Sequence, residues 1–330
     1  MTPLRHIAIV GLGSIGRRHL RLLNQLRPEI AVTLVRSGKG SRWPEEALAT
    51  QTVPSIQQAL DLGIQAAIIS SPAPTHVPQA AELIRAGIPL LIEKPLSNRL
   101  SDAVQLSDLA QQANTLVLVG YVLRYAISAL RFHELLSEGR LGVPLFARIE
   151  SGSYLPDWRP EQDYRLTASA RSELGGGVLL ELSHELDYAN WFFGPFHNMQ
   201  AALRNSGTLG IDVEDTADLV LKAHDSLPVS IHLDFCRRHA TRTCTIYGRE
   251  GSLTWDAIQN RISWLSATGD DEHWDCAAER DAMFRSQLTH FLACVEQGET
   301  PKVSLNDGID ALALVEAARR SDREGNVVYL

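Results

Sequence analysis

Val10-Gly11-Leu12-Gly13-Ser14-Ile15-Gly16 is the stretch that decides the fold of this chain. It ends the apolar run 7–10 and precedes the segment 17–26, whose leucines recur at helical spacing. Glycines at such a strand-to-helix turn allow a tight turn, close approach of a pyrophosphate and close packing of helix on strand. The helix N-terminus adds unpaired N–H groups. The stretch predicts a dinucleotide site whose cofactor-binding residues are Gly11, Gly13, Ser14, Ile15 and Gly16. A glycine-rich turn that binds no ligand is the less favoured alternative.

The rest of the first third alternates short apolar runs with helical stretches. The pattern predicts strands over 7–10, 31–35, 66–70, 89–92 and 116–119, and helices over 17–26, 77–86 and 102–112. Near-continuous apolar strands separated by helices indicate a parallel sheet that is covered on both faces. Right-handed crossovers then make the sheet doubly wound.

The pattern changes after Gly120. Several later segments alternate apolar and polar residues, as in an antiparallel sheet with one open face. The expected strands are 146–153, 217–223, 229–235, 243–247, 252–255 and 261–264, and the expected helices are 126–137, 179–193, 282–297 and 306–322. We therefore predict an α/β protein with a Rossmann domain over 1–122. An α+β domain over 123–330, with a large, mostly antiparallel sheet, is expected to bind substrate and to form oligomers.

Composition excludes several other classes of protein. The net charge of −8, without a basic block, argues against nucleic-acid binding. No apolar run approaches the roughly 20 residues that span a bilayer, and no signal peptide is visible, so we expect no membrane association. The cysteines, at 236, 244, 276 and 294, show no close pairing. This spacing favours free thiols in the cytoplasm over a disulfide framework or a metal site.

The end of the second predicted strand bears on the choice of cofactor. NAD-binding folds usually place Asp or Glu about 20 residues beyond the glycines, where the carboxylate holds the ribose 2′-hydroxyl. Here Val35 is followed by Arg36 and Ser37, with Lys39 and Arg42 nearby. Guanidinium and hydroxyl groups bind a 2′-phosphate that a carboxylate would repel. The sequence favours NADP over NAD, with Arg36 and Ser37 as cofactor contacts; solvated loop cations are the alternative.

Several motifs in order resemble the Gfo/Idh/MocA family, which includes glucose–fructose oxidoreductase and inositol dehydrogenase. After the glycines come Ser70-Ser71-Pro72-Ala73-Pro74-Thr75-His76, Glu93-Lys94-Pro95-Leu96, Gly120-Tyr121 with Arg124, Gly175-Gly176-Gly177, His184-x-x-Asp187, Phe291 and Val303-Ser304-Leu305-Asn306-Asp307-Gly308. The resemblance covers nearly the whole chain. It implies that Ser70, Pro72, His76, Glu93 and Lys94 border the cofactor.

Lys94 is the first candidate catalytic residue. It follows the apolar strand 90–92, so its ammonium is expected at the carboxyl end of the sheet, where α/β folds bind ligands. A partly desolvated lysine there can bind a substrate hydroxyl and stabilise a developing alkoxide. A surface lysine at a strand end is the alternative, and the family signature disfavours it.

The second candidate site lies in the predicted helix 179–193. Glu181, His184 and Asp187 follow at steps of three and would share one helix face. Imidazole titrates near neutrality, so His184 suits proton exchange with a carbinol, and a carboxylate beside it would orient it. Members of the family usually have an aspartate four residues before this histidine, whereas here Glu181 lies three before. The catalytic set is Lys94, His184 and Glu181, with His184 and Asp187 also facing substrate. Glu181 or Asp187 is expected to orient His184, and Asp187 alternatively caps an internal polar network. A packed core histidine is the alternative for His184.

A polar, aromatic segment precedes the glycine run at 175–177. Aromatic faces stack on sugar rings, and arginines read hydroxyls or anions. The predicted substrate contacts, with Lys94, are Trp158, Arg159, Tyr164, Arg165, Tyr121 and Arg124, the last two by the resemblance. A structural loop is the alternative for the segment.

The resemblance implies hydride transfer between a nicotinamide and a sugar or nucleotide sugar, in a homodimer or homotetramer formed through the second sheet. The alternatives are an NAD-dependent glycosidase on the same scaffold and a non-catalytic NADP-sensing regulator. Retention of Lys94 and His184 speaks against the regulator.

Overall fold

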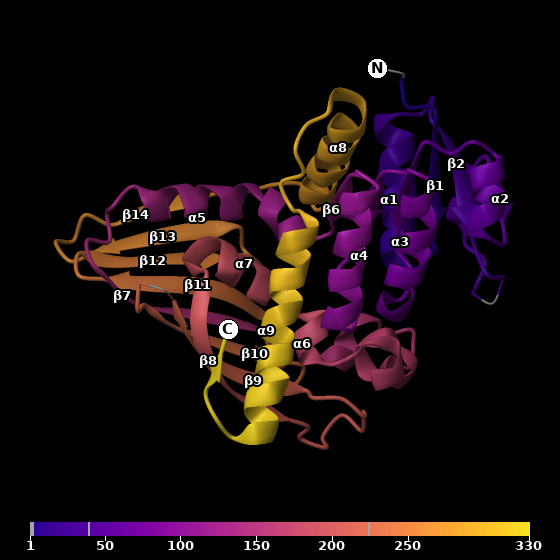
Figure 1. Cartoon of the computed structure of the whole chain (residues 1–330). Coiled ribbons are helices and arrows are strands. Elements are labelled where there is room, and N and C mark those ends of the chain that lie inside the picture. The colour runs from indigo at the N-terminus through magenta and orange to yellow at the C-terminus, as the bar shows by residue number, and fades with distance from the viewer. Residues whose placement is uncertain (1–2, 39, 224) are drawn as a thin grey trace. The chain divides into compact units, whose positions relative to one another are not determined.

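A computed structural model describes residues 3–38, 40–223 and 225–330 as two compact units. The first unit comprises Met1–Val122 with Asp281–Ile309, and the second comprises Leu123–Arg280 with Asp310–Leu330. Figure 1 labels the elements of both. No helix in the described part of the chain is long and apolar enough to cross a membrane.

The first unit contains a six-stranded parallel sheet in the order β3-β2-β1-β4-β5-β6. Its strands are β1 (His6–Val10), β2 (Ala31–Val35), β3 (Gln51–Val53), β4 (Ala66–Ile69), β5 (Leu90–Ile92) and β6 (Val117–Val119). The order reverses between β1 and β4, which confirms the predicted doubly wound fold. Ligands of such sheets bind outside the carboxyl ends of the strands at this reversal.

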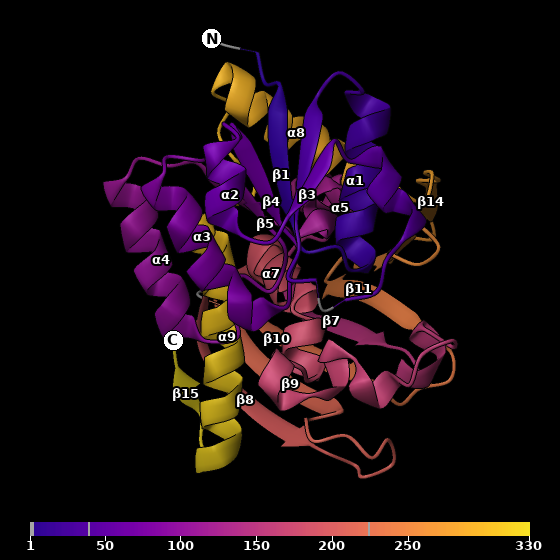
Figure 2. The same cartoon turned by 90° about the vertical axis from the view of Figure 1, so that its right-hand side faces the viewer.

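Helices cover both faces of this sheet (Figure 2). One face carries α1 (Ser14–Leu26) and α8 (Ala282–Gln297), and the other carries α2 (Ile56–Asp61), α3 (His76–Arg85) and α4 (Leu100–Gln112). Strand β3 and helix α2 were not predicted, because each is short and carries several polar residues.

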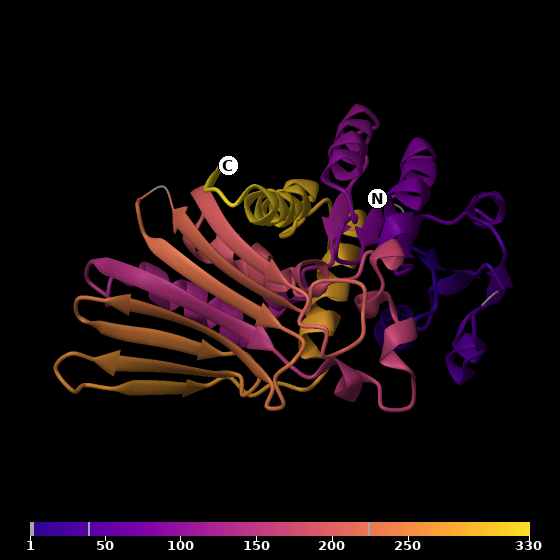
Figure 3. The same ribbon diagram turned by 90° about the horizontal axis from the view of Figure 1, so that it is seen from below.

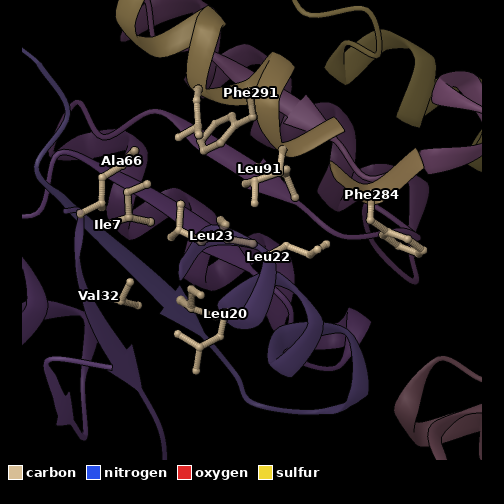
Figure 4. Close-up of a cluster of buried hydrophobic side chains, with 14 of the residues drawn as sticks. Ile7, Leu20, Leu22, Leu23, Val32, Ala66, Leu91, Phe284 and Phe291 are labelled. Carbon is tan, nitrogen blue, oxygen red and sulfur yellow. The ribbon is translucent and has the colours of Figure 1, made fainter. Parts of the chain in front are cut away.

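The core of the first unit explains why α8 belongs to it. Phe284, Leu288, Phe291 and Leu292 of α8 join a buried cluster with residues of β1 and α1, among them Ile7 and Leu23 (Figure 4). The predicted division assigned all of 123–330 to the second domain. The structure differs, since the apolar face of α8 covers the Rossmann sheet.

The second unit contains a nine-stranded sheet in the order β14-β13-β12-β11-β7-β10-β9-β8-β15. Only β7 and β10 pair in parallel; the other neighbours are antiparallel, as predicted for most of this sheet. The strands are β7 (Pro144–Gly152), β8 (Phe196–Arg204), β9 (Thr216–Ala223), β10 (Pro228–Asp234), β11 (Thr241–Gly248), β12 (Gly251–Asp256), β13 (Arg261–Ser266), β14 (Glu272–Asp275) and β15 (Val328–Tyr329). The sequence did not predict β8, β14 or β15.

Helices lie on one side of the second sheet and leave its other side open (Figure 3). They are α5 (Ile127–Ser137), α6 (Val178–Glu181), α7 (His184–Phe193) and α9 (Leu305–Glu324), the last of which begins in the first unit. The strands alternate accordingly: in β9, Ala217 and Leu219 are buried while Asp218 and Val220 are exposed.

Candidate functional site

The glycine turn of the first unit offers an open, positively polarised surface. Gly13 is the N-cap of α1, no side chain of the described residues caps the helix, and its first turn carries no acidic residue. A Cβ added to Gly13 would meet no atom within 4 Å. The N–H groups and the dipole of α1 therefore face open space beside Gly13 and the exposed Ser14, which fits an anionic pyrophosphate.

Two other glycines of this turn are needed for packing. Gly11 has a φ of +88°, and a Cβ there would lie 2.8 Å from the Ser71 amide nitrogen. A Cβ on Gly16 would lie 2.4 Å from the Gly11 carbonyl oxygen. Ser70 closes the turn, since its hydroxyl lies 2.9 Å from that carbonyl and 3.1 Å from the Val10 carbonyl. The buried Ser70 hydroxyl thus holds the loop, and the cofactor contact assigned to Ser70 stays a prediction.

The end of β2 presents a guanidinium that is already engaged. Nη1 of Arg36 lies 2.5 Å from Oε1 of Glu46, and Nη2 donates to the Ser41 carbonyl at 2.5 Å. Glu46 also accepts from the Trp43 amide at 2.7 Å; this bond, with a smaller effect of Arg36, lowers the pKa of the Glu46 carboxyl. Trp43 in turn lies under Arg17, 3.8 Å from ring centroid to guanidinium carbon.

The sequence missed Arg17, Trp43 and Glu46 because they are distant in sequence from Arg36 or from one another and match no motif. Ser37 is exposed beside Arg36, and Lys39 lies outside the described residues. Pro72 is also exposed, at the start of the short turn Ala73–Thr75, and Ile15 is half-buried. The cofactor contacts assigned to Ile15, Ser37 and Pro72 stay predictions.

The segment Glu93-Lys94-Pro95 follows β5 directly. Lys94 is partly exposed, and the Lys94–Pro95 peptide bond is cis. Glu93 is buried, and its Oε1 lies 2.6 Å from Nε2 of the fully buried His19 on α1. The Glu93 carboxylate points to this histidine, and the cofactor contact assigned to Glu93 stays a prediction.

His76, whose predicted place beside the cofactor stays a prediction, is buried between two loops. Its imidazole is 1% exposed, with Nε2 lying 2.7 Å from the Ser71 carbonyl oxygen and Nδ1 lying 3.0 Å from the Pro95 carbonyl oxygen. Both ring nitrogens face the backbone, so the ring bridges two loops and has no nitrogen directed to a cofactor.

The second unit contains the other predicted catalytic groups. Glu181 ends α6 and His184 begins α7, so the helix predicted over 179–193 is broken at Leu182 and Ser183. The regular three-residue spacing on one helix face was therefore wrong. Glu181 accepts from the Ser169 hydroxyl at 3.1 Å, and His184 is partly exposed in the first turn of α7.

Arg124 and Asp187, both predicted to bind substrate, are paired with each other. The Nε of Arg124 lies 3.1 and 3.0 Å from the two carboxylate oxygens, and Nη2 lies 2.7 Å from Oδ1. Both side chains are buried, and Arg124 also lies over Trp191. Their opposite charges compensate each other, and the substrate contacts assigned to both residues stay predictions.

The aromatic segment between β7 and α6 is an ordered loop built of short turns. Trp158 donates to the Ser153 hydroxyl at 2.7 Å, and the Tyr164 hydroxyl donates to the Leu209 carbonyl at 2.8 Å. Arg165 is exposed and pairs with Asp163 at 2.9 Å, which lowers the pKa of Asp163. Trp158 and Tyr164 thus anchor the loop, which is the structural role considered as the alternative for this segment. The contacts of their exposed faces and of Arg159 with substrate stay predictions.

Tyr121 and Glu185 complete the account of the predicted and the missed residues. Tyr121 is buried, and its predicted contact with substrate stays a prediction. Sequence reasoning missed the fully buried Glu185, whose Oε1 accepts from Nε of Arg242 at 2.8 Å. Nothing in the spacing of these two residues indicates the pair. Within the described residues, no group of three or more His, Cys, Asp or Glu could hold a metal ion.

Comparison with known proteins places this geometry in a family. Residues 5–121 match the Gfo/Idh/MocA description "Oxidoreductase family, NAD-binding Rossmann fold", and residues 133–330 match its "C-terminal alpha/beta domain". The chain belongs to the Gfo/Idh/MocA family of oxidoreductases. The resemblance and the fold class predicted from the sequence are thereby confirmed.

Individual members of the Gfo/Idh/MocA family align over most of the chain. The 1,5-anhydro-D-fructose reductase of Ensifer adhaerens is 26% identical and covers 85% of each chain. The myo-inositol 2-dehydrogenase of Thermotoga maritima is 25% identical over 98% of each. The crystal structure of the WlbA dehydrogenase from Bordetella pertussis, in complex with NADH and UDP-GlcNAcA, has a TM-score of 0.84 at 21% identity and covers 99% of this chain and 98% of its own. This last likeness shows the shared fold.

Proposed function

We propose that this oxidoreductase interconverts a carbinol and a carbonyl on a sugar or sugar derivative, using a nicotinamide dinucleotide. The observation that carries the proposal is the uncapped N-terminus of α1 at Gly13, on the same sheet edge as the lysine that follows β5. When bound, the nicotinamide supplies the chemistry of accepting or giving a hydride. Two relatives, a reductase and a dehydrogenase of polyhydroxylated compounds by name, support the substrate class.

Lys94 is proposed to bind the reacting oxygen. Its ammonium donates a hydrogen bond to the hydroxyl or carbonyl oxygen and stabilises the negative charge that develops there. Its place directly after β5, with buried residues on both sides, limits the freedom of its backbone. A fixed donor stabilises this charge without first having to be ordered.

His184 is proposed to exchange the proton of the same oxygen, and Glu181 to support it. Imidazole gains or loses a proton near neutral pH, as a reaction that runs in either direction requires. The position of His184 in the first turn of α7 leaves its side chain partly exposed, which supports this role.

Replacement of Lys94 tests the proposal. Lys94→Ala should lower kcat by about 100-fold or more while the dissociation constant of the cofactor stays close to that of the native protein. Lys302→Ala, at an exposed position shortly before α9, is the matched control. Nicotinamide absorbance would be followed with a panel of cyclitols, sugars and nucleotide sugars; full turnover by Lys94→Ala would refute the assignment.

We also propose that NADP is the preferred cofactor. The support is the guanidinium of Arg36 and the exposed Ser37 at the end of β2, where no carboxylate ends the strand. A bound 2′-phosphate would replace the Glu46 carboxylate as the partner of the Arg36 guanidinium. Loss of charge-assisted bonds of about 1.5–3 kcal/mol predicts that Arg36→Ala binds NADP about 10- to 150-fold more weakly, with little change for NAD.

Glu46→Gln sharpens this test, since it removes the charge that competes for Arg36 and should strengthen NADP binding several-fold. Fluorescence titration with NADPH and NADH measures both effects. A native protein that prefers NADH, or an Arg36→Ala variant that weakens both cofactors equally, would contradict the proposal.

The open face of the second sheet is proposed to pair with a second copy of the chain, giving a dimer or tetramer. Phe146 and Tyr247 stack there at 4.4 Å between ring centroids and are 45% and 36% exposed, and Val220 and Leu265 are also exposed. Apolar side chains on an otherwise polar sheet face mark a contact surface. Light scattering of the native protein should give a mass of two or four times 36.4 kDa. Tyr247→Glu should lower the measured mass toward the 36.4 kDa of a single chain. A monomeric native protein would refute the proposal.

A further inference from the structure

Two buried histidines hold the segment that carries Lys94, one on each side of the lysine. His19 comes from α1, the helix that the glycine turn opens, and contacts the Glu93 side chain. His76 comes from the first turn of α3, after the loop that follows β4, and contacts the Pro95 backbone. Neither histidine belongs to the proposed catalytic set.

The contact of His19 defines which ring nitrogen carries the proton. Nε2 lies 2.6 Å from Oε1 of Glu93, while Nδ1 is buried with no hydrogen-bond partner among the described residues. A proton on Nδ1 would be an unsatisfied buried donor, so the neutral ring carries its proton on Nε2 and donates to the carboxylate.

Glu93 has little freedom to leave this arrangement. A Cβ on Gly120 would lie 2.8 Å from Oε2 and 2.9 Å from Cα of Glu93, so the backbone of Gly120 backs the carboxylate. The Glu93 amide donates to the Ile69 carbonyl at 2.9 Å. The side chain and backbone immediately before Lys94 are thereby fixed.

His76 fixes the other side. Its Nδ1 lies 3.0 Å from the Pro95 carbonyl oxygen, and its Nε2 lies 2.7 Å from the Ser71 carbonyl oxygen. Ser71 packs directly against the glycine turn, since a Cβ on Gly11 would collide with it. The His76 ring therefore links Ser71, beside the glycine turn, to Pro95, the residue after Lys94.

Stability alone does not require these polar contacts. A buried ionisable pair is often neutral or worse for stability than apolar groups of the same volume, because both groups lose their hydration. The pair does give direction, since a hydrogen bond of 2.6 Å allows one orientation of each partner.

We propose that His19 and His76 are positioning residues that set the place of the Lys94 amine relative to the glycine turn. The inference rests on the proposed function of Lys94. Helices α1 and α3, which begin at the predicted cofactor loops, thus have a second role. They hold Lys94, the group proposed to act on the substrate.

Matched amide variants test the contact of His19. The amide nitrogen of His19→Gln can occupy the place of Nε2 and donate to Glu93, whereas that of His19→Asn reaches only as far as Nδ1. His19→Asn should lower kcat by about 10- to 100-fold, as expected for a misplacement of about 1 Å, with the cofactor dissociation constant nearly unchanged. His19→Gln should recover most of the loss, which a role in filling space would not produce. His19→Leu, which fills the volume without a donor, replaces the Asn variant if that one does not fold.

A second measurement does not depend on turnover. The chain has four lysines, Lys39, Lys94, Lys222 and Lys302, so reductive ¹³C-methylation gives few signals, and Lys94→Arg identifies that of Lys94. This signal should move in His19→Asn and stay near its native position in His19→Gln. His76→Leu should also move it, and the kcat losses of His19→Asn and His76→Leu should be less than additive in the double variant, because both act through one segment.

The outcomes separate the two proposals. Native kcat and an unmoved Lys94 signal in His19→Asn, or a loss of kcat with the signal unmoved, would overturn the positioning role. If no substrate on the panel is turned over by the native protein but the signal moves as described, the function assigned to the site fails while the positioning role stands.

Discussion

Gly13→Ala should separate cofactor binding from folding. The added Cβ would meet no protein atom within 4 Å, and Gly13 has a φ of −72° and a ψ of −168°, which alanine adopts without strain. Replacing glycine by alanine at the N-cap lowers the free energy of unfolding by about 0.5–1 kcal/mol. The smaller conformational entropy of the unfolded alanine variant raises it again by about 0.4–1 kcal/mol. The free energy of unfolding should therefore change by less than about 0.5 kcal/mol.

The space beside Gly13 is where the pyrophosphate is expected, so the same Cβ should obstruct the cofactor. A steric cost of about 1–3 kcal/mol corresponds to about 5- to 150-fold weaker binding. Gly11→Ala is the contrasting variant, because its φ of +88° costs about 1–2 kcal/mol and its Cβ would lie 2.8 Å from the Ser71 amide nitrogen. It should lose about 2–5 kcal/mol of stability.

Urea unfolding and NADPH titration measure the two quantities on the same preparations. If Gly13→Ala bound NADPH within twofold of the native affinity, the pyrophosphate would not lie against Gly13. If it lost more than about 2 kcal/mol of stability, the turn would be packed more tightly than described here.

The buried pair and the core give three further predictions. Arg124→Met should lose about 3 kcal/mol of stability in urea unfolding, because it leaves the Asp187 carboxylate without its guanidinium; the double variant with Asp187→Leu should recover much of this, and equal losses would contradict the account. Burial lowers the pKa of His76, so below about pH 6.5 the unfolded chain binds a proton that the folded chain does not. The free energy of unfolding should therefore decrease as the pH is lowered. His76→Gln should make this pH dependence weaker, and an unchanged pH dependence would argue against the burial of a neutral His76. Phe291→Ala should lower the free energy of unfolding by about 3–5 kcal/mol, while the fraction that stays folded should bind NADPH with native affinity. A loss below about 1 kcal/mol would contradict the assignment of α8 to the Rossmann core.

The elements with strong periodicity were predictable from the sequence. Strand β2 and helix α8 have the predicted bounds, Ala31–Val35 and Ala282–Gln297, because each contrasts sharply with its flanking polar residues. The break between Glu181 and His184 was not predictable, since Leu182 and Ser183 are compatible with a helix and only tertiary packing bends the chain there.

The contacts of the site were harder to predict than its residues. Arg124 and Asp187 were both identified, but as contacts to substrate, and they pair across 63 residues. His19 was not identified at all, because its partner Glu93 lies 74 residues away. Such partners depend on which helices and loops the tertiary fold packs together, and single-sequence patterns do not encode this.

The contribution of α8 to the first unit has a consequence for biosynthesis. The first 122 residues leave the ribosome well before Phe284, Leu288 and Phe291, which complete their core. The part of that sheet face which α8 covers, beside α1, must therefore stay bare while some 160 residues of the second unit are made. During that interval the newborn chain exposes apolar surface that a chaperone could recognise, and truncation of the chain after residue 122, which removes α8, would leave the same surface bare for good.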